Sequence, residues 1–101
     1  MHLGAFERGV LIGCLMLEAR GEGRVKMRQV AIDFHRQRDG VGTRLVRFSE
    51  EVARRAGHRE MVLHAREKAV PFYERLGYRT RGEPFVEVTL PHIAMWRALE
   101  G

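Results

Sequence analysis

The chain has 101 residues, of which 45% are apolar and 31% are charged, and its formal net charge is +5. This length and composition predict one domain over residues 1–101 with a modest hydrophobic core, and they exclude a disordered chain. The longest apolar run, residues 10–17, is shorter than the roughly 20 residues needed to span a bilayer, and no signal peptide pattern is seen. We therefore expect a cytoplasmic protein with no membrane partner.

Cysteine and arginine usage narrows the possible ligands. Cys14 is the only cysteine and lies within the apolar run, which predicts a buried structural thiol and no internal disulfide. No histidine, cysteine and acidic residues have the spacing of a metal site. Sixteen arginines against two lysines suit a ligand with several phosphates, because a guanidinium can pair with two oxygens. These arginines are spread along the chain rather than grouped in an arm or recognition helix, which argues against nucleic acid as the partner.

The first third of the sequence predicts three β-strands. Residues 2–8 and 10–18 have the composition of strands and are joined at Gly9, which indicates a hairpin. Glycines at 21 and 23 mark a turn, and residues 24–32 then predict a third strand.

A helix is predicted after this strand, and its end is marked by Gly57. Its apolar stripe consists of Val41, Leu45, Phe48, Val52 and Ala56, which recur at helical spacing. The opposite face carries two pairs of opposite charge at i,i+4, namely Glu50–Arg54 and Glu51–Arg55. We expect both pairs to form on the solvent side.

The second half of the sequence predicts a strand, a helix and two further strands. Residues 61–65 read as a short buried strand, and residues 69–76 read as a helix with Pro71 in its first turn and Gly77 as its stop. Residues 78–81 and 90–99 predict the last two strands, with a loop between them. The helix that follows the third strand implies a parallel strand pair, so we expect an α/β fold with a mixed sheet.

The turn before the first helix is a candidate site for an anion. It reads Gln37-Arg38-Asp39-Gly40-Val41-Gly42-Thr43-Arg44-Leu45. Glycines let a ligand approach the main chain closely, and the N–H groups and dipole at a helix start favour a phosphate. The spacing matches neither a Walker A loop nor the dinucleotide-binding fingerprint. Taken alone, the pattern also fits an ordinary strand–helix turn.

Three segments together resemble the GNAT superfamily of acetyl-CoA-dependent N-acyltransferases. The turn resembles the Gln/Arg-x-x-Gly-x-Gly/Ala loop of that family, and residues 69–78 resemble its Ala-x-x-x-Tyr-x-x-x-Gly-aromatic segment. Residues 82–95 resemble the tail of one bacterial subgroup. The resemblance spans about residues 3–99 and implies a mixed, mainly antiparallel sheet with splayed central strands and two helices. Typical members begin with one more strand and two helices beside the acceptor site, so it also implies an N-terminally truncated form.

The resemblance implies acetyl-CoA as cosubstrate. Its pantetheine would pair with the third strand, and its pyrophosphate would bind the N–H groups of the loop. The implied cofactor-binding residues are Val30, Ala31, Ile32, Gln37, Arg38, Asp39, Gly40, Val41, Gly42, Thr43, Arg44, Arg66 and Phe72. Three of them depart from the common pattern. Arg38 replaces a glycine, Arg66 replaces an asparagine, and Asp39 places a negative charge beside the phosphate unless it caps the helix.

Tyr73 is the candidate acid of the reaction. An amine that attacks a thioester expels a thiolate, and a tyrosine with a pKa near 10 can supply the proton that this thiolate needs. Glu87 and His92, in the third segment, are candidate bases for the amine, and His64 at the end of a strand is another. Each of these residues could instead have a structural role, Tyr73 as a core aromatic residue and the others as solvated polar groups.

The predicted function is therefore transfer of an acetyl group from acetyl-CoA to the amine of a small molecule or peptide, by direct attack in a ternary complex. The alternative is a non-catalytic CoA-binding or protein-interaction module of the same fold, which the expected truncation favours. A homodimer would supply the missing wall of the acceptor cleft and would cover exposed strand edges.

Overall fold

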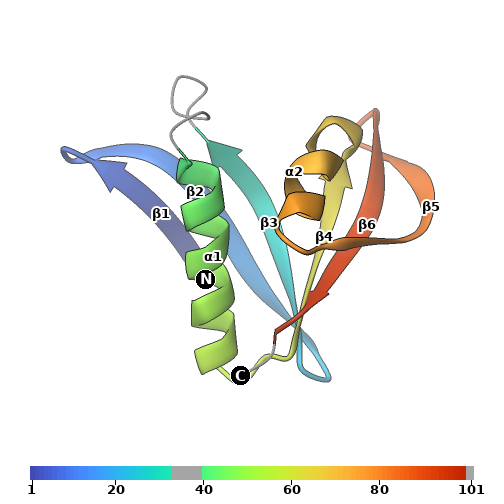
Figure 1. The fold of residues 1–101 in the computed structure, drawn as a ribbon, viewed down its shortest axis with the longest axis horizontal. Coiled ribbons are helices and arrows are strands. Elements are labelled where there is room, and N and C mark those ends of the chain that lie inside the picture. Colours follow the sequence, from blue (N-terminus) through green and yellow to red (C-terminus); the bar gives the residue numbers. More distant parts are fainter. Residues whose placement is uncertain (33–39, 100–101) are drawn as a thin grey trace.

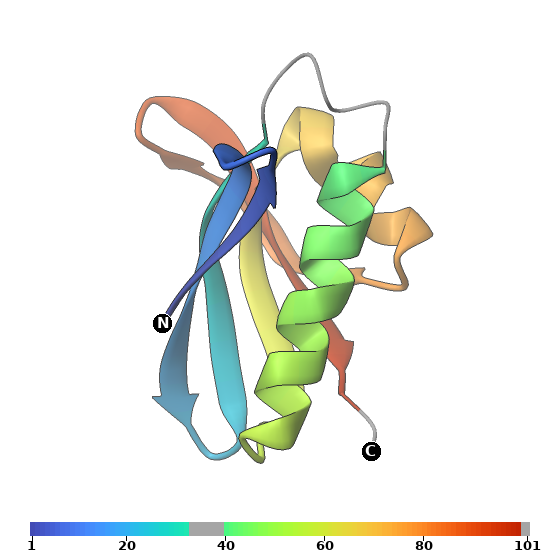
Figure 2. The ribbon, with the colours of Figure 1, turned by 90° about the vertical axis from the view of Figure 1, so that its left-hand side faces the viewer.

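The structure is a computed structural model that describes residues 1–32 and 40–99. It is an α/β fold in which a six-stranded sheet carries both α-helices on one face (Figures 1 and 2). In chain order the elements are β1 (His2–Glu7), β2 (Val10–Gly21), β3 (Arg24–Ile32), α1 (Val41–Arg55), β4 (Glu60–Arg66), the 3-10 helix η2 (Glu67–Ala69), α2 (Val70–Arg75), β5 (Arg79–Glu87) and β6 (Leu90–Ala98). The predicted mixed, mainly antiparallel sheet with two helices is confirmed.

The sheet has the strand order β1-β2-β3-β4-β6-β5, and only β3 and β4 are parallel. These two strands pair from Arg24 and Glu60 to Met27 and Leu63, and no further pairing between them is found in the described residues. Both strands continue beyond this point, so they diverge toward their C-terminal ends (Figure 1). We call residues 28–32 of β3 and 64–66 of β4 the splayed segment. It confirms the splayed central strands that the sequence predicted.

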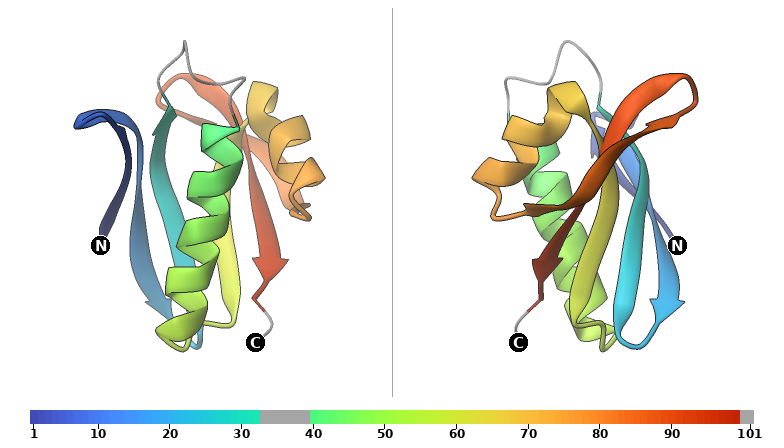
Figure 3. Two further views of the ribbon diagram at one scale, coloured as in Figure 1. Left: turned by 60° about the vertical axis from the view of Figure 1, so that its left-hand side comes forward. Right: turned by 90° about the vertical axis from the view of Figure 1, so that its right-hand side faces the viewer.

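The hydrophobic core lies between the sheet and α1. Met61, Leu63 and Ala65 of β4 are at most 2% exposed and alternate with more exposed residues. Alternate residues of a strand point to opposite faces of the sheet, so these three side chains meet the buried Leu45 and Val46 of α1. In the ranges that the structure describes, no helix covers the opposite face (Figure 3).

The free cysteine shows the effect of this one-sided covering. Cys14 was predicted to be buried, but it is only half-buried. It precedes the buried Leu15 in β2 and therefore points to the face without helices. An apolar run in a sequence does not reveal which of its alternate residues lacks a covering layer.

The predicted burial of α1 was partly wrong. Val41 and Leu45 are buried as expected, but Phe48 is 52% exposed. The buried stripe instead includes two polar residues, Ser49 and Glu50. Ser49 is satisfied by a hydrogen bond from its hydroxyl to the carbonyl oxygen of its own helix turn, at 2.6 Å. A search for apolar residues alone cannot find a stripe whose polar members are buried with their partners.

The ion pairs of α1 also differ from the prediction. Glu51 pairs with Arg55 as expected, at 3.0 Å, but it also pairs with Arg54. Arg54 was predicted to pair with Glu50. Glu50 is instead buried against the sheet and accepts a hydrogen bond from Arg97 of β6 at 3.0 Å. Arg97, a tertiary partner that local spacing cannot reveal, takes the place predicted for Arg54.

The predicted loop between the last two strands is also a correction. Strand β5 runs from Arg79 to Glu87 and pairs with β6 across an irregularity between Arg81 and Phe85. The two strands meet in a two-residue turn at Val88 and Thr89, whose φ angles are 50° and 61°. Such turns usually contain glycine, asparagine or aspartate, because β-branched residues rarely adopt positive φ. The sequence therefore lacked the usual signal for this hairpin.

Candidate active site

The start of α1 offers main-chain donors to a ligand. Gly40 is the N-cap residue with φ 72°, and a Cβ atom built there would meet no other atom within 4 Å. The N–H group of Arg44 bonds to the carbonyl oxygen of Gly40 at 3.0 Å. The N–H groups of residues 41–43 precede this first helical bond and so have no intrahelical acceptor. With no acidic residue in this turn, the helix start suits an anion.

Part of the predicted loop cannot be compared with the structure. Gln37, Arg38 and Asp39 lie outside the described residues. Of the remaining loop positions, Val41 and Gly42 are buried, and Thr43 and Arg44 are exposed. The main chain at residues 41–43 and the side chains of Thr43 and Arg44 are therefore the groups here that can face a ligand.

The predicted strand contacts lie at the same end of the sheet as this helix start (Figure 1). Val30, Ala31 and Ile32 form the end of β3, and Ala31 and Ile32 pair with β2 on one side only. Their other edge belongs to the splayed segment and has no strand partner among the described residues. Such an edge can pair with an extended amide chain, which is how the pantetheine of acetyl-CoA would fit. Exposed Arg66 ends β4 across from this edge.

Tyr73 lies on α2 at the border of the core. Its side chain is 5% exposed, and its ring makes edge contacts with Phe72 at 5.0 Å and Tyr78 at 5.7 Å between centroids. Burial raises the pKa of Tyr73 to about 12, above the value near 10 expected from the sequence. The phenol therefore keeps its proton throughout the neutral range, as a proton donor must.

Tyr78 provides a contrast with Tyr73. Its hydroxyl donates to the buried carboxylate of Glu50 at 2.8 Å, and burial followed by the charge of Glu50 raises the pKa of Tyr78. The Tyr78 proton is therefore held in a hydrogen bond that links the residue before β5 to α1. Of the two tyrosines in the chain, Tyr73 remains the candidate acid.

Four polar side chains meet on the helix-free face of the sheet. We call Lys26, His64, Glu87 and His92 the histidine cluster. His64 Nδ1 lies 3.1 Å from Glu87 Oε1 and 3.3 Å from Lys26 Nζ. His92 Nε2 lies 3.8 Å from Glu87 Oε2. The ring of Phe85 contacts both imidazoles, with its centroid 4.9 Å from that of His64 and 6.2 Å from that of His92. The cluster therefore joins four strands beside the splayed segment.

The histidine cluster can hold its protons in more than one arrangement. His64 Nδ1 donates to Glu87 when it carries a proton and accepts from Lys26 when it does not, because one nitrogen cannot do both. The hydrogen bond from His64 is the main cause of a lowered pKa at Glu87. Burial, followed by the nearby charges of Arg20 and Arg28, lowers the pKa of Lys26. The lowered pKa keeps the Glu87 carboxylate ionised beside the two imidazoles.

His92 has a defined orientation within this cluster. Its Nδ1 lies 2.9 Å from the carbonyl oxygen of Leu90, which can only accept. Nδ1 therefore carries the proton in the neutral ring, and Nε2 keeps its lone pair on the side of Glu87. His92 also lines a pocket of about 400 Å³ between α2 and the β5–β6 hairpin, most of whose other described walls are apolar, such as Val70 and Ile93.

The structure brings some of the predicted catalytic residues together and separates others. Glu87 and His92 are neighbours, and His64 joins them. Tyr73 lies in the core between the sheet and the helices, on the other face. Lys26 was not singled out by the sequence. It alternates with the buried Val25 and Met27, which would have marked it as facing the other side of the sheet, but the register that sets it beside His64 is a tertiary feature.

Comparisons with known proteins agree with this geometry. A family model described as Acetyltransferase (GNAT) domain matches residues 1–99. A Bacillus subtilis (strain 168) protein named as an acetyltransferase is 30% identical over 94 residues, which are 93% of this chain and 63% of that protein. The chain thus spans less than two thirds of that relative's length.

Solved structures have the same fold. A protein of Lactobacillus plantarum described as an N-acetyltransferase aligns with a TM-score of 0.88 and 26% identity, over 93% of this chain and 64% of that one. An aminoglycoside 6'-N-acetyltransferase in complex with coenzyme A also aligns with a TM-score of 0.88, at 17% identity, over 99% of this chain and 73% of that one. With the match over residues 1–99, the chain belongs to the GNAT acetyltransferase family.

Two further observations concern residues 1–32 and 40–99. No helix there has both the length and the apolar character needed to cross a membrane. No three histidine, cysteine or acidic side chains there are grouped so that they could hold a metal ion.

Proposed function

We propose that this domain transfers an acetyl group from acetyl-CoA to an amine by direct attack in a ternary complex. One observation carries the proposal: β3 and β4 part after Met27 and Leu63, at the end of the sheet where α1 begins with N–H groups that have no intrahelical acceptor. An extended thioester chain fits the first feature and a pyrophosphate fits the second. Membership of the GNAT family, and a neighbour of the same fold that binds coenzyme A, support acetyl-CoA as donor.

The donor would be held mainly by the main chain. The residues proposed to bind acetyl-CoA are Val30, Ala31, Ile32, Gln37, Arg38, Asp39, Gly40, Val41, Gly42, Thr43, Arg44, Arg66 and Phe72. The β3 edge would pair with the pantetheine amides, and the N–H groups that open α1 would bind the pyrophosphate. Exposed Arg44 and Arg66 are free to swing toward the outer phosphates. Phe72, half-buried beside Tyr73, would contact the apolar part of the chain.

Tyr73 is proposed as the acid of the reaction. The amine nitrogen attacks the thioester carbonyl, a C–N bond forms, and the C–S bond breaks. The departing sulfur takes the phenol proton. The burial of Tyr73 supports this role because the apolar surroundings exclude water from the developing thiolate.

The histidine cluster is proposed as the base, with Glu87 and His92 as its central pair. An amine must lose a proton before or during attack. The lone pair on His92 Nε2 can take that proton, and the resulting imidazolium would lie beside the carboxylate of Glu87. His64 connects the same carboxylate to Lys26 and offers a second route for the proton. An acid and a base on opposite faces of the sheet suit a reaction in which the donor lies between the strands.

The acceptor is proposed to be the amine of a small molecule or peptide that approaches from the helix-free face. A second copy of the chain in a homodimer would cover this face and help to exclude water from the reaction.

A glycine substitution tests the donor site. Gly40→Val should abolish measurable acetyl-CoA binding in titration calorimetry, because a branched side chain would occupy the open space above the helix start. The matched control is Gly21→Val. Gly21 also has positive φ, 84°, and also has open space around its Cβ position, so it carries the same backbone strain away from α1. Equal affinity in the two variants would contradict the proposed site.

The alternative function is a CoA-binding or interaction module without turnover. The uncovered sheet face beside the histidine cluster favours it, since a bound amine there would be open to water. The two functions differ in one measurement, the release of free CoA thiol when acetyl-CoA is mixed with a broad panel of amines. Thiol release that depends on the amine supports the transferase, and donor binding with no release from any amine supports the module.

A further inference from the structure

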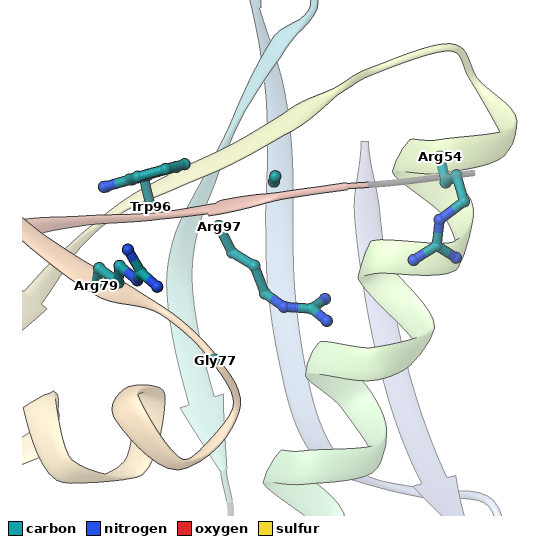
Figure 4. Close-up of a pocket in the computed structure, with 6 residues that line it drawn as sticks. Arg54, Gly77, Arg79, Trp96 and Arg97 are labelled. Carbon is teal, nitrogen blue, oxygen red and sulfur yellow. The ribbon is translucent and has the colours of Figure 1, made fainter.

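A second pocket lies at the opposite end of α1 from the donor site. Its described lining consists of Arg54, Gly77, Arg79, Trp96, Arg97 and Ala98 (Figure 4). We call it the arginine pocket. Its volume is about 400 Å³. Three of its side chains are guanidinium groups that come from three different elements, α1, β5 and β6, and none of its described lining residues is acidic. The folding of the chain thus gathers like charges that repel each other.

The neighbouring carboxylates do not neutralise this charge. Glu50 is shared between Arg97 and Arg47, at 3.0 and 2.9 Å. Glu51 is shared between Arg54 and Arg55. Each carboxylate therefore faces two guanidinium groups, and Arg79 adds a further positive charge to the pocket. Among the described residues, the region around the pocket keeps a net positive charge, which a bound anion would offset.

Some donors of these arginines have no partner among the described residues. The buried Nε of Arg54 has no hydrogen-bond partner in the part of the chain that the structure describes. Arg97 has five N–H groups, and one of them donates a hydrogen bond to Glu50. Gly77, with φ 97°, lets the Arg97 side chain lie against the main chain, where a Cβ would come within 3.0 Å of Arg97 Nε. Arg97 is therefore held in place by its surroundings, with donors left for a ligand.

We propose that the arginine pocket binds a phosphate group of a small molecule. Guanidinium groups that line one cavity match the oxygens of a phosphate, each of which can accept more than one hydrogen bond. Trp96 also lines the pocket, so a ring attached to the phosphate could contact it. The pocket is separate from the donor site, because Arg54 lies 14 residues along α1 from Gly40, or about 20 Å. The proposal does not depend on the proposed function.

The chain contains a built-in reporter for this site. Trp96 is the only tryptophan, so its fluorescence observes the arginine pocket alone. We would titrate the protein with inorganic phosphate and, separately, with adenosine monophosphate, at constant ionic strength set with chloride, with and without coenzyme A. The variants are Arg79→Gln, which removes an exposed side chain of the pocket, and Arg55→Gln as a matched control. Arg55 shares Glu51 with Arg54 but does not line the pocket.

The expected result is a saturable change in Trp96 fluorescence with phosphate that chloride does not reproduce. Arg79→Gln should weaken the apparent affinity at least about 10-fold, whereas Arg55→Gln and bound coenzyme A should leave it unchanged. Tighter binding of the nucleotide than of phosphate would support a ring on Trp96, and equal binding would support a site for the phosphate alone. The proposal is overturned by the absence of saturation, by equal binding to the two variants, or by competition from coenzyme A.

Discussion

Tyr73 carries the chemical step of the proposed reaction, and the chain offers a clean way to test it. Tyr73→Phe keeps the ring, its burial and its contacts with Phe72 and Tyr78, and removes only the hydroxyl. We expect donor affinity and stability to stay close to those of the parent. We expect the rate of amine-dependent thiol release to fall about 10²- to 10⁴-fold, the usual value of a positioned proton donor.

The measurement is the steady-state rate of thiol release at saturating acetyl-CoA, beside calorimetry of donor binding. The control is Tyr78→Phe, which removes the other phenol and should lower stability through the loss of its bond to Glu50 rather than abolish the chemistry. Full activity of Tyr73→Phe would return Tyr73 to the role of a core aromatic residue.

At the scale of single residues, the candidate site residues could be identified from the sequence by their type and spacing. Tyr73 stands four residues before Gly77, which ends the helix with positive φ, and this pattern could be read directly. The orientation of His92 could not, because it depends on a carbonyl oxygen in the hairpin. Nor could the environment of Tyr73 be read from spacing. Its pKa is raised by atoms brought from distant parts of the chain.

At the scale of elements, Glu50 ties α1 to the sheet. Its buried carboxylate joins Arg47 in the same helix, Arg97 in β6 and the hydroxyl of Tyr78 before β5. Glu50→Ala should lower the free energy of unfolding by about 3 kcal/mol, toward the low end for a broken buried ion pair, because both arginines can still reach water. Glu51→Ala is the control, since Glu51 lies on the exposed side of α1 and should cost less than about 1 kcal/mol.

Urea unfolding of the two variants would measure this difference. A loss at Glu50 no larger than that at Glu51 would mean that the connection between helix and sheet adds nothing beyond a surface ion pair. Both residues look alike in the sequence, since each stands four residues before an arginine. Only the packing of α1 separates them, and for this reason the sequence predicted two equal surface pairs.

Tertiary packing that local patterns cannot reveal also explains why the β5–β6 hairpin was not predicted from the sequence. Strand periodicity located β1 to β4 and the start of β5, because their residues fit a strand or mark its turns. The β5–β6 turn contains Val88 and Thr89, residues that usually mark a strand rather than a turn. Pairing across the sheet, which resumes at Phe85 and His92, fixes this turn against local preference.

At the scale of the whole molecule, one face of the sheet is covered by helices and the other carries the histidine cluster. A monomer would leave that cluster open to water, and an amine bound there would be poorly positioned. We therefore expect the working form to be a homodimer that buries at least about 1,000 Å². Light scattering at micromolar concentration would check this. A monomer that transfers acetyl groups at a full rate would contradict the expectation.

The overall architecture was predictable, since the order of strands and helices and the three family-like segments fix a mixed sheet. What could not be predicted is the gathering of charges, because sixteen arginines spread along the sequence give no hint that three of them line one pocket. Local patterns select elements, and only their packing creates sites.

Hydrogen exchange in the presence of acetyl-CoA tests the central claim most directly. If the donor lies between the parted strands, its addition should slow exchange of the main-chain amides in residues 28–32, 41–43 and 64–66. Exchange in β1 and at the C-terminal end of α1 should not change. Protection confined to those distant regions, or no protection at saturating acetyl-CoA, would contradict the account.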